Sequence, residues 1–190
     1  MSYKVLSYPN GINIIKGYAT FETCEALVAV IKEAKTGGFM TDWAHQEKPN
    51  KILRVPKAKG QLVIDQCVKD YTEFCKVTYN FNGVLCREQT NLTEWPVGCG
   101  RDPHNDYEFF WTSFTTILYL NDDFDGGELI FTQQNITIKP ERGDVVIFPS
   151  QSRVLEHEVK PPTDKSRYTL AIWLQSETPY IPSVTSAPQG

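Results

Sequence analysis

The stretch that decides the fold runs from Trp95 to Trp173. It contains, in order, His104-Asn105-Asp106, Tyr119-Leu120-Asn121, Gly126-Gly127-Glu128-Leu129, His157-Glu158-Val159 and a last strand that begins at Arg167. The chain has three histidines, and two of them lie here. Two histidines and one aspartate are the ligand set of a non-haem Fe(II) site, which keeps coordination positions open for small ligands. The stretch therefore predicts a metal centre.

The spacing of these residues favours one shared ion. Residues two apart on extended backbone face the same side, so His104 and Asp106 can reach the same metal. The third ligand must come from another strand, and His157 is the candidate. Arg167 begins a largely apolar strand, where a charge is costly unless a partner neutralises it. That partner is either a structural Asp or Glu, or a ligand carboxylate gripped by the guanidinium fork.

From Gly83 onward the pattern is all β. Short segments rich in Val, Ile, Thr and aromatic residues are separated by Gly, Pro, Asn and Asp, which is typical of strands joined by turns. The expected strands are residues 84–94, 110–121, 128–133, 135–139, 143–149, 154–160 and 167–175. Closely spaced short strands without helices between them favour a sandwich, a barrel or a jelly roll.

The N-terminal part mixes strands and helices. Residues 4–8 and 12–15 read as strands around the turn Pro9-Asn10-Gly11. A helix is expected over 20–36, with Thr20 as its N-cap and Gly37-Gly38 as its stop. Its apolar face is Leu27, Val28, Val30 and Ile31. A second helix is expected over 61–77, with a core-facing stripe of Leu62, Val63, Cys67, Val68, Tyr71, Phe74 and Cys75.

Residues 39–60 are expected to form a long loop between the two helices. Five basic residues lie in it with no acidic residue between them: Lys48, Lys51, Arg54, Lys57 and Lys59. Such a run is usually a solvated surface. The alternative is a mobile lid that meets an acidic or phosphate-bearing partner.

Length and composition bound the class of protein. The 190 residues suffice for one domain, with helical support at about 18–77, a core at about 83–175 and a tail at 176–190. The net charge of -4 disfavours broad nucleic-acid binding. No apolar run reaches the roughly 18 residues of a membrane span. The N-terminus lacks a secretory pattern, and the five cysteines contain no C-x-x-C pair, so we expect free thiols and a cytoplasmic location.

The ordered motifs resemble the prolyl 4-hydroxylase-like group of 2-oxoglutarate- and Fe(II)-dependent dioxygenases. That group shows H-x-D, Y-L-N, G-G-x-L, P-x-x-G-x-x-x-x-F, H-x-V, and a basic residue ahead of an aliphatic strand that ends in Trp. This chain has every element in order over roughly residues 90–175, with Pro140 to Phe148 as the fourth motif. The resemblance implies a mainly β fold, a double-stranded β-helix (jelly roll) with the N-terminal helices packed on its larger sheet.

The resemblance also implies roles for single residues. His104, Asp106 and His157 would bind Fe(II) and form the catalytic centre. Arg167 would pair with the distal carboxylate of 2-oxoglutarate, helped by the hydroxyl of Tyr119. Alternation along the strand puts two further pocket residues on the face of Tyr119, and three apolar residues would form pocket walls. These five are Thr115, Ile117, Leu129, Val159 and Trp173. The alternative for these five residues and Tyr119 is ordinary core packing.

Two positions depart from the group's pattern. Trp95 stands where the group often has tyrosine, and an indole offers one N–H and no hydroxyl. Arg167 follows His157 by ten positions rather than nine, while Lys165 follows it by eight. We favour Arg167 because it begins the apolar strand and precedes Trp173 by the expected interval.

The activity implied is hydroxylation of an unactivated C–H bond, with a prolyl residue of a peptide or protein as the favoured target. Fe(II), 2-oxoglutarate and O2 would be required, ascorbate would serve as reductant, and succinate and CO2 would be co-products. Hydroxylation of a free amino acid or other small molecule uses the same residues. A non-catalytic jelly-roll module that binds a metal or ligand is a further alternative. A nucleic-acid demethylase is disfavoured, because Trp173 stands where such enzymes carry a second arginine.

Overall fold

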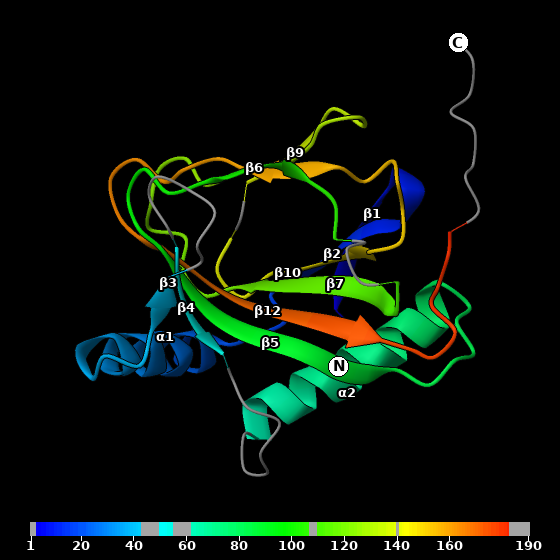
Figure 1. Cartoon of the computed structure of the whole chain (residues 1–190), viewed down its shortest axis with the longest axis horizontal. Coiled ribbons are helices and arrows are strands. Elements are labelled where there is room, and N and C mark those ends of the chain that lie inside the picture. Colours follow the sequence, from blue (N-terminus) through cyan, green and yellow to red (C-terminus); the bar gives the residue numbers. More distant parts are fainter. Residues whose placement is uncertain (1–2, 43–49, 55–61, 107–109, 140, 183–190) are drawn as a thin grey trace.

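Two antiparallel sheets lie face to face, and two helices cover the outer side of the larger one (Figure 1). The computed structural model describes residues 3–42, 50–54, 62–106, 110–139 and 141–182. Within this part of the chain, all strand pairs of both sheets are antiparallel. The arrangement agrees with the two-layered β fold expected from the sequence.

The larger sheet has the spatial order β1-β2-β10-β7-β12-β5-β4-β3. Its strands are β1 (Lys4–Tyr8), β2 (Ile12–Lys16), β3 (Thr41–Asp42), β4 (Lys51–Arg54), β5 (Cys86–Trp95), β7 (Thr112–Tyr119), β10 (Val145–Pro149) and β12 (Arg167–Gln175). The smaller sheet has the order β6-β11-β8-β9. Its strands are β6 (Arg101–His104), β8 (Leu129–Phe131), β9 (Ile136–Ile138) and β11 (His157–Val159). Strands distant in sequence therefore lie side by side at the centre of the larger sheet.

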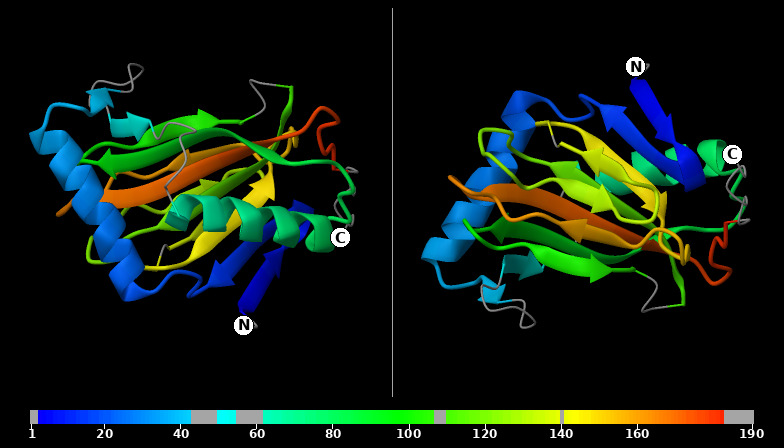
Figure 2. Two further views of the ribbon diagram at one scale, coloured as in Figure 1. Left: turned by 90° about the horizontal axis from the view of Figure 1, so that it is seen from below. Right: turned by 90° about the horizontal axis from the view of Figure 1, so that it is seen from above.

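The helices are α1 (Phe21–Thr36) and α2 (Leu62–Thr78), and a 3-10 turn spans Pro9–Gly11. Thr20 caps α1, because its side chain accepts a hydrogen bond from the backbone N–H of Thr23. Both helices cross the outer face of the larger sheet (Figure 2, left). In the described part of the chain, neither helix is long and apolar enough to cross a membrane.

Three of the apolar residues assigned to helix faces are exposed. Val30 is on the solvent side of α1, and Leu62 and Val63 are exposed at the start of α2. The buried stripe of α2 instead begins at Ile64 and continues through Cys67, Tyr71 and Cys75. The prediction was wrong here because consecutive apolar residues point to different sides of a helix. Only one side can face the sheet, and the others are left in solvent.

Two hydrophobic clusters fill the layers. The outer cluster lies between the helices and the larger sheet, and includes Leu27, Ile31, Cys67, Tyr71, Leu118, Leu170 and Ile172. The inner cluster lies between the two sheets, and includes Ile12, Tyr119, Leu129, Phe131, Val146 and Phe148. Because strand side chains alternate in direction, the same strands of the larger sheet supply both clusters.

Three short strands that the sequence did not predict join the sheets. The expected loop 39–60 contains β3 and β4, and β4 pairs with β5. Strand β6 carries His104 and pairs with β11. Of the basic run, Lys51 forms an ion pair with Asp42. Lys48, Lys57 and Lys59 lie outside the described residues, so the lid remains a prediction.

Candidate metal centre

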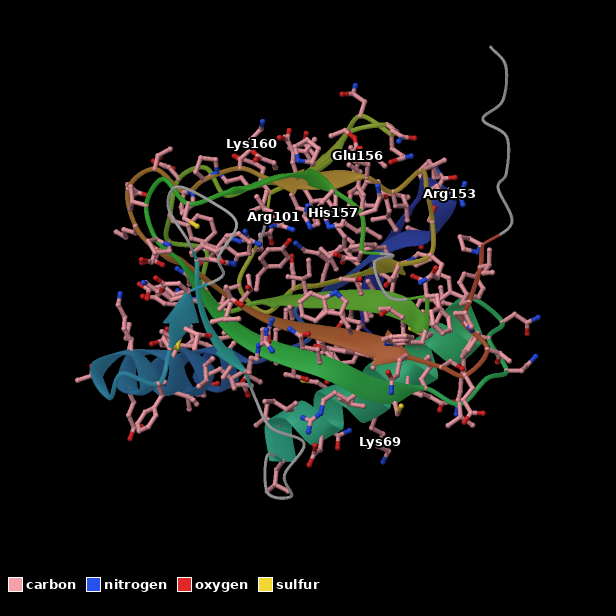
Figure 3. All side chains as sticks on the ribbon, viewed as in Figure 1. Lys69, Arg101, Arg153, Glu156, His157 and Lys160 are labelled. Carbon is pink, nitrogen blue, oxygen red and sulfur yellow. The ribbon has the colours of Figure 1, made fainter. Side chains whose placement is uncertain are left out.

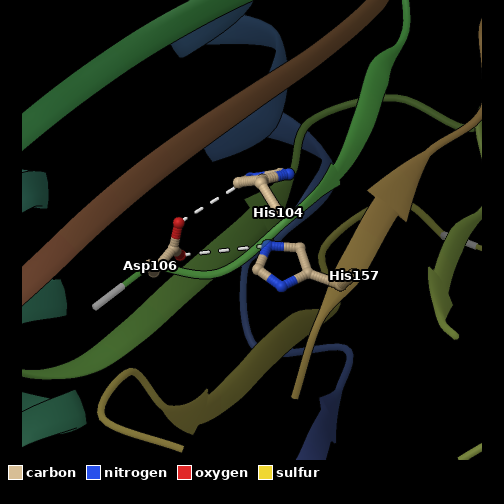
Figure 4. A group of neighbouring side chains, drawn as sticks. All are labelled: His104, Asp106 and His157. Atoms are coloured by element: carbon tan, nitrogen blue, oxygen red, sulfur yellow. Dashed lines mark ion pairs between the residues drawn. The ribbon is translucent and has the colours of Figure 1, made fainter. Parts of the chain in front are cut away.

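His104, Asp106 and His157 meet between the two sheets (Figure 4). One possible ligand atom of each lies within 4.8 Å of those of the other two. His104 ends β6 and His157 begins β11, and the two are direct partners in the register of these strands. The Nε2 atoms of His104 and His157 lie 3.7 and 3.9 Å from the Asp106 carboxylate oxygens. Pairing of the short, unpredicted strand β6 is therefore what joins the distant parts of the motif.

Backbone carbonyls fix the orientation of both imidazoles. The Nδ1 of His104 lies 2.8 Å from the carbonyl oxygen of Asp102, and the Nδ1 of His157 lies 3.0 Å from that of Leu155. A carbonyl only accepts, so each Nδ1 carries the proton and each Nε2 is left with a lone pair. Both lone-pair nitrogens face Asp106, which is the orientation that a metal ligand needs.

Electrostatics keep His104 neutral. Burial, followed by the proximity of His157, lowers the pKa of His104 to about 4, against the opposing effect of Asp106. A neutral imidazole is the form that binds a metal. Aromatic rings of Phe131 and Phe148 pack around His157 at 5.6 and 5.0 Å between centroids, which shields it from water.

Two side chains of the larger sheet hold the carboxylate of Asp106. The hydroxyl of Thr115 donates to its Oδ2 over 2.7 Å, and the indole N–H of Trp173 donates to the same oxygen over 3.3 Å. The Thr115 hydroxyl also lies 2.8 Å from that of Ser150. Hydrogen bonds of this kind orient a ligating carboxylate before the metal arrives.

The donor set fits the ion that the resemblance implies. Two neutral imidazole nitrogens and one carboxylate form the facial ligand set that Fe(II) takes while keeping coordination positions open. The three donors already face a common point, and their orientations are fixed by neighbouring groups rather than by an ion. The residues present therefore fit a bound Fe(II).

A cavity of about 250 Å³ extends from the three ligands across the inner face of β5, β7 and β12. Its lining includes Thr115, Ile117, Val159, Arg167 and Trp173, which the sequence assigned to the pocket. Leu129 and Tyr119 are not in the lining, and both are fully buried in the inner cluster behind it. The roles of these side chains toward a co-substrate remain predictions.

Arg167 is fully buried in the cavity lining, six residues along β12 from Trp173, whose indole contacts Asp106. No carboxylate of the described residues pairs with it, and its Nε and Nη1 lack hydrogen-bond partners. Its guanidinium carbon lies 5.0 Å from the ring centroid of Trp95 and 5.2 Å from that of Tyr119. Burial lowers the pKa of Arg167. A buried guanidinium with unused donors is costly and is suited to an anionic ligand.

The Gly126-Gly127 turn leaves room for this arginine. Both residues have positive φ, and a Cβ on Gly127 would lie 2.6 Å from the Phe124 ring and 3.2 Å from the Arg167 side chain. A Cβ on Gly126 would lie 2.5 Å from a backbone oxygen of Pro161. The turn therefore requires glycine for both conformation and space.

The two departures from the family pattern have different outcomes. The indole N–H of Trp95 donates to the hydroxyl of Thr169 over 3.1 Å, and its ring stacks beside Arg167. Trp95 thus serves as a wall of the cavity and uses its one donor on the protein. Lys165 is exposed and lies 3.4 Å from Asp123, while Arg167 lines the cavity.

Several polar residues of the cavity were not assigned to the metal site or its pocket from the sequence. They are Asn50, Arg54, Gln89, Asn91, Thr93, Arg101 and Thr169. Alternation along β5 could have found Gln89, Asn91 and Thr93, because they share the face of Trp95. Arg54 could not be found in this way, since its strand was read as a loop.

A family model matches the segment that contains the candidate metal ligands. Residues 90–175 match the model of the 2OG-Fe(II) oxygenase superfamily. Over these 86 of the 190 residues the chain is similar to that superfamily. The oxygenase segment begins within β5 and ends with β12, so it contains all three candidate ligands and Arg167.

Curated relatives of this oxygenase are much longer proteins. Mouse prolyl 3-hydroxylase 2 is 33% identical over 87 residues, which are 43% of this chain and 12% of the relative. Chicken prolyl 3-hydroxylase 2 is 32% identical over 155 residues, which are 67% of this chain and 22% of the relative. The chain therefore spans only a small part of the length of these relatives.

Solved structures share the fold over most of the chain. A Pseudomonas putida prolyl-4-hydroxylase matches with a TM-score of 0.74 at 19% identity, covering 90% of this chain and 95% of its own. A Trichoplax adhaerens prolyl hydroxylase in complex with a hypoxia inducible factor peptide matches with a TM-score of 0.74 at 20% identity, covering 89% and 85%. The predicted family, enzyme class and jelly-roll fold are confirmed at this level.

Proposed function

We propose that the chain is a 2-oxoglutarate- and Fe(II)-dependent dioxygenase that hydroxylates a prolyl residue of a peptide or protein, with succinate and CO2 as co-products. Ascorbate as reductant and a cytoplasmic location belong to the same proposal. Hydroxylation of a free amino acid or another small molecule is the second candidate, because it uses the same metal and co-substrate residues.

One observation carries the proposal: a single cavity has a metal-ligand set at one end and an unpaired buried guanidinium at the other. A dicarboxylate such as 2-oxoglutarate fits this arrangement, since one carboxylate reaches Arg167 while the other end approaches the ligands. A purely structural role would leave Arg167 without the partner that its burial demands.

Side chains in the cavity lining and directly behind it would each have a separate role. Arg167 holds the distal carboxylate through its free N–H groups, and the Tyr119 hydroxyl, which has no hydrogen-bond partner, adds a donor beside it. Trp95, Ile117 and Val159 exclude water from the cavity. Bound Fe(II), with 2-oxoglutarate and O2, supplies the oxidising power for inserting oxygen into a C–H bond. The protein contributes orientation and a fixed ligand geometry.

The choice of a prolyl target is supported by the relatives. The curated relatives are prolyl 3-hydroxylases, and the structural neighbours include prolyl hydroxylases, one of them in complex with a peptide. The cavity lies between the sheets, and Asn50 and Arg54, at strand β4, form part of its lining.

The test uses protein loaded with Fe(II) under anaerobic conditions. Binding of 2-oxoglutarate is measured first by calorimetry, and O2 is then admitted with a panel of proline-containing peptides and free amino acids. We expect succinate, together with one added oxygen on one substrate by mass spectrometry. A peptide or an amino acid as the modified species decides between the two candidates. Absence of both 2-oxoglutarate binding and succinate would refute a catalytic role and leave a metal-binding module.

A further inference from the structure

Asn91 presents an unused hydrogen-bond donor to the cavity. It lies on β5, is 1% exposed, and forms part of the cavity lining. Its Oδ1 accepts a hydrogen bond from Gln89 over 3.2 Å, while its Nδ2 has no partner. A buried donor without an acceptor is costly, and the cost disappears when a ligand oxygen accepts the bond. Asn91 therefore points to an oxygen-bearing ligand.

The position of Asn91 separates it from the end of the cavity that holds Arg167. Across the larger sheet, Arg54 pairs with Asn91, Asn91 with Ala171, and Ala171 with Ile117. All four line the cavity. Ala171 is four residues from Arg167 on the same strand, a distance of about 13 Å at the usual rise of a β-strand. Asn91 therefore lies beside a part of β12 that is two same-face positions from Arg167 and one from Trp173.

The four paired residues Arg54, Asn91, Ala171 and Ile117 lie close to the metal ligands. Trp173 follows Ala171 by two residues on the same face of β12, and its indole N–H contacts Asp106. Its direct partner on β7 is Thr115, which also contacts Asp106. A ligand that enters between β4 and the metal would therefore pass Asn91 and Arg54.

The cavity lining carries more positive than negative charge around Arg54 and Arg101. Arg54 and Arg101 both line the cavity, and neither forms an ion pair within the described part of the chain. The sole carboxylate of the described lining is Asp106. Asp106 and the two carboxylates of 2-oxoglutarate would balance a divalent ion and Arg167. The positive charge of Arg54 and Arg101 then has no counterpart in the filled site.

Arg101 reaches the cavity from the opposite layer. It lies on β6 and pairs in register with Val159 of β11, the strand that begins at His157. Figure 3 shows Arg101 beside His157 on the side of the smaller sheet, whereas Lys69 extends from α2 on the far side of the larger sheet. Positive charge therefore faces the cavity from both sheets.

We propose that Asn91 and Arg54 form a substrate subsite that binds a carboxylate beside the C–H bond that reacts. The inference rests on the proposed function, because it places the substrate in the same cavity. A neutral carbonyl would satisfy Asn91 alone, whereas a carboxylate would also pair with the charge of Arg54, its direct neighbour across the sheet. The carboxylate has two possible sources: the α-carboxylate of a free or C-terminal amino acid, or an acidic side chain next to the target within a peptide.

Binding to inactive protein tests the subsite without turnover. The protein is loaded with Mn(II) and 2-oxoglutarate in the absence of O2, and binding is measured by calorimetry. One probe pair is N-acetyl-proline against N-acetyl-prolinamide, which tests an α-carboxylate. The other pair is acetyl-Ala-Pro-Asp-Ala-amide against its Asn analogue, which tests an acidic side chain. We expect one charged probe to bind about tenfold more tightly than its neutral partner, the effect of a hydrogen bond to a charged group.

Three variants test which residues cause the tighter binding of the charged probe. Arg54→Gln and Asn91→Leu should each reduce it about tenfold, while the affinity for 2-oxoglutarate stays unchanged. Lys51→Gln is the matched control, because Lys51 lies on the same strand, pairs with Asp42 and does not line the cavity. Arg54 is exposed, so its substitution keeps the test valid even if Asn91→Leu fails to fold.

The results separate this inference from the proposed function. If 2-oxoglutarate binds but no charged probe binds better than its neutral partner, the subsite is wrong and the proposed function stands. The subsite is also wrong if the preference persists in both Arg54→Gln and Asn91→Leu. Failure of the Mn(II)-loaded protein to bind 2-oxoglutarate would count against the proposed function itself.

Discussion

The two faces of strand β12 carry different kinds of side chain, one for core packing and one for lining the cavity. The face toward the helices carries large side chains of the outer cluster: Tyr168, Leu170, Ile172 and Leu174. The face toward the smaller sheet lines the cavity: Arg167, Thr169, Ala171 and Trp173. Because successive side chains of a strand alternate in direction, a single sequence of eight residues, residues 167–174, serves both faces.

The contrast shows where stability and function are located. On the helix-covered face, Leu170, Ile172 and Leu174 are at most 1% exposed and are stabilised by burial of apolar area. On the cavity face of the sheet, Arg167 of β12 and Asn91 of β5 have buried donors without partners. Such donors lower stability until a ligand pairs with them, so this face is suited to binding rather than to stabilising the fold.

The largest effect should come from removing a metal ligand. His104→Ala leaves two donors of the three, and we expect metal-dependent succinate formation to fall below detection. Its unfolding temperature without metal should change little, because His104 is partly exposed at the end of a short strand. The checks are a succinate assay, metal analysis and thermal unfolding. Turnover that persists in the variant would remove His104 from the metal centre.

A pair of substitutions on β12 tests the contrast between its faces. Leu170→Ala should lower the free energy of unfolding by about 2 to 5 kcal/mol, because it empties volume in a close-packed core. Arg167→Gln should weaken 2-oxoglutarate binding by about 2 to 3 kcal/mol, roughly 100-fold, through lost hydrogen bonds to a charged group. Chemical denaturation and calorimetry measure the two quantities in each variant.

A sharper test is to measure 2-oxoglutarate affinity in Leu170→Ala and stability in Arg167→Gln. Leu170→Ala should leave the affinity for 2-oxoglutarate unchanged as long as the protein is folded. Arg167→Gln should leave the stability of the ligand-free protein unchanged or increase it, since it removes a buried charge without a partner. A large loss of stability in Arg167→Gln would mean that the arginine is structural, and the contrast between the faces would fail.

The sequence predicted this division well where motif and alternation coincide. His104, Asp106, His157 and Arg167 were singled out because their chemistry is unusual for their setting and their order matches a family, and the structure places all four around one cavity. Most strand ranges followed from local composition. These signals are carried by neighbouring residues, so no knowledge of long-range pairing was needed.

The remaining part of the site depends on pairing that local sequence does not reveal. Strand β6 reads Arg101-Asp102-Pro103-His104, which is polar and contains proline, and it becomes a strand only through pairing with β11. The same holds for β4, which pairs with β5 and brings Arg54 next to Asn91. The unpaired donor of Asn91 likewise becomes visible only when its neighbours are placed.

A smaller effect, on metal affinity, should follow from substituting one of two adjacent threonines that lie on opposite faces of β7. Thr115→Val removes the hydroxyl that donates to Asp106, and we expect the affinity for Mn(II) to fall about tenfold, as for other groups that orient a ligand. Thr116→Val is the matched control, because its hydroxyl donates to the carbonyl of Ile172 instead. It should affect stability alone. Equal losses of Mn(II) affinity in a titration of both variants would refute a specific role of Thr115.

The smallest predicted effect uses two buried cysteines as reporters of Arg167. Burial raises the pKa of both Cys24 and Cys99 to about 11, and the charge of Arg167 opposes the rise at Cys99 alone. Removing that charge disfavours the thiolate, so Arg167→Gln should raise the pKa of Cys99 further. Alkylation of Cys99 between pH 8 and 10 should then slow relative to Cys24, as followed by mass spectrometry. Bound 2-oxoglutarate should have the same effect in the unsubstituted protein, because it neutralises the guanidinium. An unchanged ratio of the two rates in both experiments would show that the charge of Arg167 does not reach Cys99.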